Sequence, residues 1–418
     1  MNARDGFGTG CTVLSVNAGS SSLKFALHPV AADGGVQCAS LSGLAEGLEP
    51  GGPPRIRLQR DGATLQSELA VGPGTSGFDV ALRKVIQSVQ GDGAPLPMAV
   101  AHRVVHGGER CRSSVVIDDV MMDYLDSLAP LAPLHQPHNL AGVRAFQRAL
   151  PGVPQVACFD TAFHAGAPEE ERTFALPEAM GRAGIQRYGF HGLSYAYCIS
   201  IPQLSRWQAR GRVLMAHLGN GASLCAARDG RSVATTMGFS ALDGLMMGTR
   251  SGALDPGVLL HLLRQGMGAE AIEELLYKKS GLLGVSGISA DMRTLRASDA
   301  PAAARAIRLF TYRVVRESGA LVAVLGGLDA LVFTGGIGEH DRRLRSDVCR
   351  ALGHLGIALD DARNDEADGC CVASIHAQES AVEVWVVPTD EGRVAARDAV
   401  ALLALTGPAE KGIEPAFA

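Results

Sequence analysis

Residues 13–27 read VLSVNAGSSSLKFAL, and this stretch is the most informative feature of the chain. An apolar run enters a turn of small residues at Asn17, Ala18 and Gly19, and the polar return strand carries Lys24. The pattern predicts a β-hairpin whose turn lets backbone N–H groups approach a phosphate chain, with a lysine charge beside it. The stretch lacks the Walker pattern G-x4-G-K-S/T of helix-based phosphate loops. An ordinary hairpin with a polar turn is the alternative.

The composition is that of a packed globular protein. A chain of 418 residues is long enough for about two domains. Apolar residues make up 47% and charged residues 19%, which excludes a disordered chain. Scarce aromatic residues, at 5%, and 51 glycines favour α/β layers joined by glycine turns. The net charge of −5 gives no indication of nucleic-acid or anionic-membrane binding.

The cysteines and the N-terminal residues indicate the compartment. Nine cysteines, odd in number, scattered and without C-x-x-C spacing, are typical of free thiols in a reducing cytoplasm. The first ten residues contain no apolar segment of a secretory signal. The longest apolar stretch, 320–333, is interrupted by Gly326, Gly327 and Asp329. We therefore expect a cytoplasmic protein with no membrane span.

Strand-like and helix-like segments alternate along the chain, which predicts an α/β fold with buried sheets. Further strands are expected at 98–106, 156–163, 330–334 and 382–391, and helices at 140–149, 256–279 and 301–325. Residues 28–75, rich in Gly, Pro and Ser, are interpreted as excursions between strands, residues 129–139 as a proline-punctuated loop, and residues 335–338 as a glycine turn.

Residues 213–226, VLMAHLGNGASLCA, repeat the pattern of residues 13–26. At a constant offset of 200, four residue pairs coincide: Val13/Val213, Leu14/Leu214, Gly19/Gly219 and Ala26/Ala226. Both segments read as strand, glycine turn and polar strand. The repeat predicts two similar hairpins that can hold one phosphate chain from two sides.

Seven motifs follow one another along the chain: VNAGSSSLK (16–24), AHRVVHGGE (101–109), CFDTAFH (158–164), RYGFHGLSY (187–195), AHLGNGASL (216–224), MMGTRSGALDPG (246–257) and FTGGIGEH (333–340). Arg103 and Arg250 suit phosphoryl transfer between two anions, because a planar guanidinium matches a carboxylate or phosphoryl edge. His102 and His106, four residues apart, lack a third ligand nearby, which disfavours a zinc site.

With these motifs the chain, from residue 13 to about residue 391, closely resembles the acetate kinase family, part of the superfamily of sugar kinases, actin and heat-shock chaperone ATPases. The resemblance implies a duplicated α/β fold, actin-like and ribonuclease H-like, of two domains with a central cleft. Each half would be built on a five-stranded mixed sheet. The first domain would span 1–163, with a C-terminal helix at 392–418 packing back on it, and the nucleotide-binding domain would span 164–391.

The resemblance also implies site residues. Asn17 and Glu391 would hold Mg²⁺, with Mn²⁺ as an alternative, and Lys24 would lie near the nucleotide phosphates. Arg103 would bind the substrate carboxylate, in a pocket walled by Val105, Leu134 and Phe190. Asp160, His191 and Arg250 would be the catalytic groups. The ATP site would be lined by His217, Leu218, Gly219, Asn220, Gly221, Asp291, Met292, Arg293, Gly336, Ile337, Gly338, Glu339 and His340.

The implied reaction is the reversible, Mg²⁺-dependent, direct in-line transfer of the γ-phosphoryl group of ATP to acetate, giving acetyl phosphate and ADP. A homodimer is implied as well. Acetate is already ionised at neutral pH, so its attack needs no general base. We therefore expect Asp160 to orient an arginine or the metal shell rather than to move a proton.

Two departures from the family pattern leave details open. Asp390 precedes Glu391 where relatives often have asparagine, and it can join or replace Glu391 at the metal. Ala241 stands where many relatives have proline in the acid pocket. The room gained is about one methylene, worth only ~1–3 kcal/mol, so propionate or another short-chain acid is an alternative substrate.

Two alternative functions, from other classes of protein, are disfavoured. A non-catalytic nucleotide-binding module would not need Arg103 and Arg250 together. A nicotinamide-dependent dehydrogenase would need a strand–GxGxxG–helix unit, which the sequence lacks.

Overall fold

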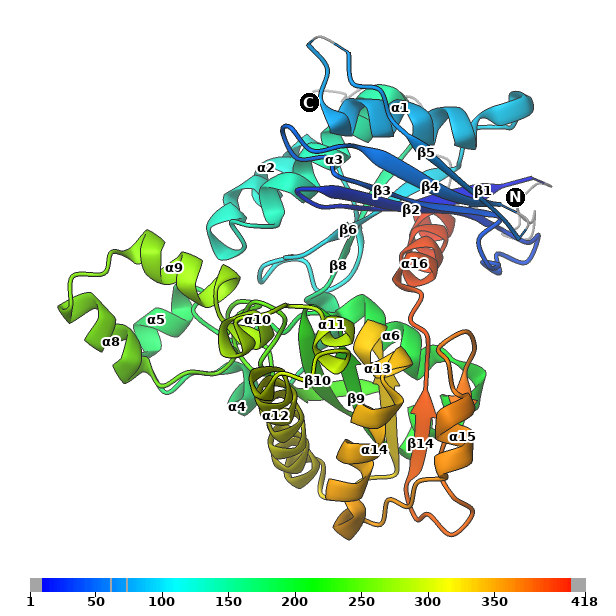
Figure 1. Ribbon diagram of the computed structural model, residues 1–418. Helices are drawn as coiled ribbons and strands as arrows, with labels where there is room; N and C mark the ends of the chain where they lie inside the picture. Colours follow the sequence, from blue (N-terminus) through cyan, green and yellow to red (C-terminus); the bar gives the residue numbers. More distant parts are fainter. Residues whose placement is uncertain (1–9, 61, 73, 407–418) are drawn as a thin grey trace, which may run out of the picture. The chain divides into compact units, whose positions relative to one another are not determined.

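The computed structural model describes residues 10–60, 62–72 and 74–406 (Figure 1). Two sequence expectations fall partly outside these residues: the one on the first ten residues, at 1–9, and the end of the helix expected at 392–418, at 407–418. The chain divides into two compact units. Unit 1 contains the residues up to 107, residues 113–159 and those from 391 onward, and unit 2 contains residues 108–112 and 160–390.

Unit 1 is built on an eight-stranded sheet in the order β5-β4-β3-β2-β1-β6-β8-β7. The strands are β1 (Thr12–Ala18), β2 (Ser22–Pro29), β3 (Leu41–Glu46), β4 (Arg55–Arg60), β5 (Ala63–Glu68), β6 (Ala99–Val104), β7 (Val115–Val116) and β8 (Gln155–Phe159). β1 and β2 pair antiparallel in continuous register, with Asn17 opposite Lys24. The predicted hairpin at residues 13–27 is thereby confirmed.

Three helices pack on this sheet: α1 (Gly77–Val89), α3 (Gln136–Ala149) and α16 (Glu391–Thr406). A fourth helix, α2 (Asp119–Ser127), packs against α3. Side chains alternate across a strand, so Leu14 and Val16 of β1 share one face, where they join α1 and α3 in the core. Ser15 points to the other face, where α16 contacts β1 and β6. The contact is close, because a Cβ on Gly392 would lie 2.6 Å from Ser15 Oγ.

Unit 2 is built on a six-stranded sheet in the order β11-β10-β9-β12-β14-β13. The strands are β9 (Arg212–Leu218), β10 (Ala222–Arg228), β11 (Arg231–Thr235), β12 (Ala330–Thr334), β13 (Ala373–Ser374) and β14 (Glu383–Val386). The helices are α4 (Glu169–Arg172), α5 (Glu178–Arg182), α6 (Gly192–Ser200), α7 (Ser205–Arg210), α8 (Pro256–Arg264), α9 (Ala269–Lys278), α10 (Gly281–Ser286), α11 (Met292–Arg296), α12 (Pro301–Leu325), α13 (Gly335–His340), α14 (Arg342–Ala351) and α15 (Asp361–Glu366).

The two sheets share a five-stranded arrangement. β3-β2-β1-β6-β8 in unit 1 corresponds to β11-β10-β9-β12-β14 in unit 2. In each, an antiparallel hairpin is followed by two strands parallel to its first strand. The repeat at residues 13–26 and 213–226 therefore marks a real duplication. The expected five strands account for this common part, and β4, β5, β7 and β13 extend the sheets beyond it.

The expectation for residues 28–75 is wrong, because β3, β4 and β5 form there as an antiparallel meander. All side chains of β5 are exposed, and only Ile56 of β4 is buried. An edge strand of this kind carries no apolar run, which is the feature that makes a buried strand visible in a sequence.

Three helix boundaries also differ from expectation. The helix expected at 256–279 is two helices, α8 and α9, separated at Gly266, whose φ is +87°. α3 begins at Gln136 rather than at residue 140, because Pro137 fits the first turn of a helix. The glycine turn expected at 335–338 is the first turn of α13. None of the helices in the described residues has the length and hydrophobicity that crossing a bilayer demands.

Candidate active site

One cluster of expected site residues forms in unit 1, where β1 and β6 end and α16 begins. Arg103 Nη1 donates to Asn17 Oδ1 at 3.4 Å, and Arg103 Nε lies 3.6 Å from Glu391 Oε2. The side chains of Arg103 and Glu391 are 21% and 24% exposed, so a ligand from solvent can reach them. Asn17 lies 86 residues before Arg103 in the sequence and Glu391 lies 288 residues after it (391 − 103), yet both contact the same guanidinium.

The oxygen atoms of this cluster are of the chemical kinds that bind small divalent ions. An amide oxygen from Asn17 and a carboxylate oxygen from Glu391 are ligands that Mg²⁺ accepts. Within residues 10–60, 62–72 and 74–406, no three His, Cys, Asp or Glu side chains are grouped to hold a metal. An ion held by so few protein ligands keeps several waters or substrate oxygens, which is the usual state of Mg²⁺.

The other residues expected in unit 1 are Lys24, Val105 and Leu134. Lys24 is exposed on β2, opposite Asn17. Val105 is buried, and its N–H donates to Asn139 Oδ1 at 3.0 Å. Asn139 Nδ2 in turn donates to the carbonyl of Ala18 at 2.7 Å, which fastens the segment after β6 to the hairpin turn. Leu134, just before α3, is half-buried.

Sequence reasoning missed the two buried amides of α3, Asn139 and Gln136. Gln136 accepts from the N–H of His106 at 3.2 Å and donates to its carbonyl at 3.1 Å. The signal was present, because amides beside a proline at a helix start are suited to bonding a neighbouring backbone.

In unit 2, Asp160 and His191 are joined through the backbone. Asp160 directly follows β8 and is 1% exposed, and its carbonyl accepts from Gly192 N–H at 2.8 Å. A Cβ at position 192 would lie 2.2 Å from that carbonyl oxygen, so only glycine fits there. His191 precedes α6 in the left-handed conformation, with φ +59°. Its Nδ1 lies 2.8 Å from Ser223 Oγ, which also bonds Tyr195 Oη, so the ring orientation is fixed.

His191 and Arg250 face the same backbone position. A Cβ on Gly221 would lie 3.4 Å from His191 Nε2 and 3.8 Å from Arg250 Nη1. Arg250 Nη1 donates to the carbonyl of Ala241 at 2.9 Å, which holds the guanidinium in place. An imidazole nitrogen and a cation are thus directed at one side of the turn between β9 and β10.

Phe190 is buried and is held by His164. The carbonyl of Phe190 can only accept, so His164 Nε2, 3.0 Å away, carries the proton. His164 Nδ1 then accepts from Ser232 Oγ at 2.8 Å. Burial lowers the pKa of His164 to about 4, so this ring is neutral at neutral pH. His164 is therefore a structural support beneath the segment that carries His191.

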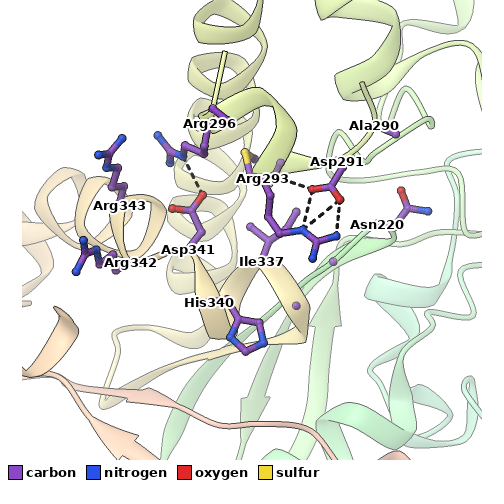
Figure 2. Close-up of a pocket in the computed structure, with 14 residues that line it drawn as sticks. Asn220, Ala290, Asp291, Arg293, Arg296, Ile337, His340, Asp341, Arg342 and Arg343 are labelled. Carbon is purple, nitrogen blue, oxygen red and sulfur yellow. Dashed lines mark hydrogen bonds and ion pairs between the residues drawn. The ribbon is translucent and has the colours of Figure 1, made fainter. Parts of the chain in front are cut away.

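A cavity of about 940 Å³ opens in unit 2 beside the β9–β10 turn (Figure 2). This volume suits a nucleotide-sized ligand. Eight of the residues expected for ATP line it: Gly219, Asn220, Asp291, Met292, Arg293, Gly336, Ile337 and His340. The remaining wall is formed by Ala290, Arg296, Ala297, Asp341, Arg342 and Arg343.

Local geometry explains how these walls are held. Asp291 caps α11 by accepting from Arg293 N–H at 2.7 Å, and it pairs with the Arg293 guanidinium at 2.6 Å (Figure 2). This hydrogen-bonded pairing lowers the pKa of the Asp291 carboxyl. Gly335 has φ +75°, and a Cβ there would lie 2.8 Å from the carbonyl oxygen of Leu218. Glycine therefore lets α13 start directly beside β9.

Other residues expected for ATP do not line the cavity: Lys24, His217, Leu218, Gly221, Gly338 and Glu339. Glu339 Oε1 accepts from Gly335 N–H at 2.8 Å and from Thr389 N–H at 3.1 Å. Its carboxylate therefore fixes the start of α13 to the segment after β14. His217 Nδ1 lies 2.8 Å from Ser194 Oγ.

The run RRLR at 342–345 has the composition of a solvated helix face. Arg342 and Arg343 are indeed exposed, and they also line the cavity. Arg345 is fully buried, which the charge pattern does not indicate.

Known proteins resemble the chain over most of its length. The family model of the acetokinase family matches residues 12–397. The acetate kinase of Rhodopseudomonas palustris is 47% identical over 392 residues, which are 92% of this chain and 96% of that relative. The crystal structure of Porphyromonas gingivalis acetate kinase is 37% identical, with a TM-score of 0.81, and the match covers 94% of this chain and 99% of that one. A propionate kinase from Francisella tularensis is 33% identical, with a TM-score of 0.83 and coverage of 93% and 98%.

Proposed function

The chain belongs to the acetokinase family, and on that premise we propose that it catalyses the reversible transfer of the γ-phosphoryl group of ATP to acetate, forming acetyl phosphate and ADP. It is thus a phosphotransferase with a carboxyl group as acceptor. The observation that carries the proposal is the β9–β10 turn. Its Gly221 faces His191 Nε2 and Arg250 Nη1, while its Gly219 and Asn220 line the 940 Å³ cavity.

The nucleotide occupies this cavity in the proposal. Backbone at Gly219 and Gly336 admits close approach of phosphates, since neither residue has a side chain. Arg293 and the apolar side chains of Met292 and Ile337 supply contacts for the nucleoside. The β9–β10 turn then receives the γ-phosphoryl end.

The acceptor and the metal are assigned to the unit 1 cluster. Arg103 binds the acetate carboxylate through its planar guanidinium. Asn17 and Glu391 would hold Mg²⁺, which neutralises the phosphate oxygens when it is bound. Val105, Leu134 and Phe190 would form the walls of the acid pocket.

The transfer step needs positive charge on the equatorial oxygens of the phosphoryl group, because that group is nearly planar at the transition state. His191 and Arg250 supply a donor and a fixed cation at Gly221. Acetate attacks the phosphorus while the bond to the ADP oxygen breaks, so no proton moves and no covalent enzyme intermediate is required.

In this scheme the Asp160 carboxylate orients an arginine or the metal shell and moves no proton. The backbone carbonyl of Asp160, which accepts from Gly192 N–H, is retained in Asp160→Asn, so this variant tests the carboxylate alone. Asp160→Asn is expected to lower kcat and to alter the dependence of the rate on metal concentration. Near-normal turnover with unchanged metal dependence would refute the role, and Asp160→Asn must first be shown to keep the normal unfolding midpoint.

Propionate is the second candidate acceptor. Ala241 leaves room for about one methylene in the pocket, and a propionate kinase is among the similar structures. The carbonyl of Ala241 also holds Arg250, so position 241 is linked to the transfer site. A cytoplasmic homodimer that uses Mg²⁺ completes the proposal.

An acyl-hydroxamate assay with ATP and Mg²⁺ tests the function. Acetate, propionate and butyrate are titrated in parallel, and kcat/KM is compared. The highest value with acetate supports the proposal, and the highest with propionate transfers it to the second candidate. Nucleotide binding without hydroxamate from any acid would overturn the proposal.

A further inference from the structure

A second cavity, of about 610 Å³, lies in unit 2 between α11, α12 and α14. Part of its wall is apolar, formed by Leu295, Ile307 and Val315. Three arginines line the same space, Arg296 from α11, Arg308 from α12 and Arg343 from α14, together with Tyr312 and one carboxylate, Asp347. Arg296 and Arg343 also line the 940 Å³ cavity, and the other residues of this second cavity have no role in the reaction proposed above.

The arginines of this cavity have unused hydrogen-bonding capacity. In the described part of the chain, Arg308 and Arg343 make no ion pair and no side-chain hydrogen bond. Arg296 Nε donates to Asp341 at 3.0 Å, but its Nη2 is buried without an acceptor among the described residues. A buried donor without an acceptor costs free energy. Asp341 offsets the charge of Arg296 and Asp347 offsets a second positive charge, so the three arginines leave the cavity with a net charge of about +1.

We propose that this second cavity binds a phosphate monoester with an aromatic or apolar body. Guanidinium groups recognise phosphate oxygens through paired N–H donors, and a small turn of Arg296 would give its Nη2 an acceptor. Tyr312 is 61% exposed and offers an aromatic face to the body of the ligand. The apolar wall at Leu295, Ile307 and Val315 contacts the same body. A bare inorganic anion would leave that wall unused.

The second cavity is linked to the first. Arg296 and Arg343 line both cavities. Figure 2 shows the two guanidinium groups together at one end of the first cavity, away from Asn220. An anion in the second cavity draws these cations toward itself and adds negative charge near the nucleotide. It therefore weakens nucleotide binding, and the nucleotide weakens the anion by the same factor. This consequence rests on the proposed function, whereas occupancy of the second cavity does not.

Calorimetric titration with phenyl phosphate, in the absence and presence of saturating ADP, tests the proposal. We expect one site that persists with ADP bound, at reduced affinity. Arg308→Ala removes a cation that lines only the second cavity, at an exposed position where the fold is not at risk. It should weaken phenyl phosphate about 10- to 100-fold, as the loss of a charged hydrogen bond implies. Arg316→Ala, on the same helix and outside both cavities, is the matched control and should bind normally.

Kinetics provide the second readout. Phenyl phosphate should raise the KM for ATP to a plateau, and the plateau should vanish in Arg308→Ala, with kcat unchanged. If the KM for ATP instead rises without a plateau as phenyl phosphate is added, and equally in the wild-type and Arg308→Ala proteins, the probe competes directly in the nucleotide cavity. That result would overturn the proposal. Absence of binding to the wild-type protein would also overturn it. Binding in calorimetry without any turnover would support the second cavity while refuting the proposed function.

Discussion

The imidazole rings of His191 and His217 stack, with their centroids 4.1 Å apart and their planes 21° from parallel. The Nδ1 atom of each ring is hydrogen-bonded to a serine hydroxyl: that of His191 to Ser223 and that of His217 to Ser194. The two serines come from β10 and α6, so strand and helix together set the position of His191 Nε2. His217, expected to line the ATP site, thus contributes as a platform for His191.

Replacing His191 tests whether its ring stabilises the transferring group. His191→Ala should lower kcat by about 10²–10³, the usual effect of removing one transition-state donor. The KM for ATP should change little, because His191 does not line the 940 Å³ cavity. Ser223→Ala leaves the ring but removes its Nδ1 partner, and we expect a smaller loss. Initial-rate kinetics of both variants give the comparison, and equal losses in kcat and nucleotide affinity would contradict this role.

Arg345 is expected to hold the nucleotide cavity in shape. It is 0% exposed and donates to five acceptors, the carbonyls of Gly338, Glu339, Asn364 and Ala367 and the Asn364 side chain. Arg345→Met leaves these acceptors without donors, which should cost at least about 3 kcal/mol of unfolding free energy. The KM for ATP should rise, since Gly338 and Glu339 belong to α13.

The control for Arg345 is on the same helix. Arg350→Met removes an exposed ion pair with Asp361 and should change stability by less than about 1 kcal/mol. Urea unfolding measures both variants. If Arg345→Met unfolds at the same urea concentration as Arg350→Met, the buried network is not stabilising.

Acid should destabilise the fold through buried histidines. Burial lowers the pKa of His102, His106 and His164 to about 4 in each case. Because the unfolded chain binds these protons near pH 6.5, stability is full above pH 6.5 and falls as the pH drops toward 4. Each histidine contributes about 2–3 kcal/mol over this window. Urea unfolding at pH 7.5 and 5.0 measures the loss, and His164→Gln should reduce the difference between the two pH values. If His164→Gln loses as much stability between pH 7.5 and 5.0 as the wild type does, His164 does not contribute to the acid destabilisation.

Exposed leucines near α8 provide a surface for the proposed homodimer. Leu254, Leu260 and Leu263 are 43%, 51% and 50% exposed. Exposed apolar groups clustered on one element mark interaction surfaces. Leu260→Glu should shift the protein toward monomers in light scattering after size-exclusion chromatography. Leu405→Glu, at a position that is 85% exposed on α16, is the control and should leave the oligomeric state unchanged. A dimer unaffected by Leu260→Glu would place the interface elsewhere.

The duplicated core could be predicted because its hairpins carry an apolar strand before a glycine turn, at Gly19 and again at Gly219. β5 could not, because all of its side chains are exposed and give no apolar pattern. Its pairing with β4 comes from backbone hydrogen bonds, which depend little on the side chains. Pattern reasoning therefore detects the centre of a sheet before it detects its edges.

The candidate site was predictable where backbone constraint selects the residue. Gly192 and Gly335 stand where a Cβ would meet a carbonyl oxygen, so their motifs are recognisable. The second cavity was not predictable, because Arg308 and Arg343 lie on amphipathic helices whose polar faces look alike in sequence. Only the packing of α11, α12 and α14 brings the charges together.

Unit 1 combines the first and the last segments of the chain, and this affects how the protein folds during synthesis. Its last element, α16, begins at Glu391 and covers one face of β1 and β6. A ribosome synthesises β1 379 residues earlier, 391 − 12, and β6 292 residues earlier, 391 − 99. Unit 2 is complete in sequence at residue 390, so it can fold while unit 1 still has one apolar face without its helix. In a nascent chain this face of the sheet therefore stays open to aggregation and proteolysis until α16 has been synthesised. A chain truncated before residue 391 lacks α16, so its unit 1 keeps this face exposed.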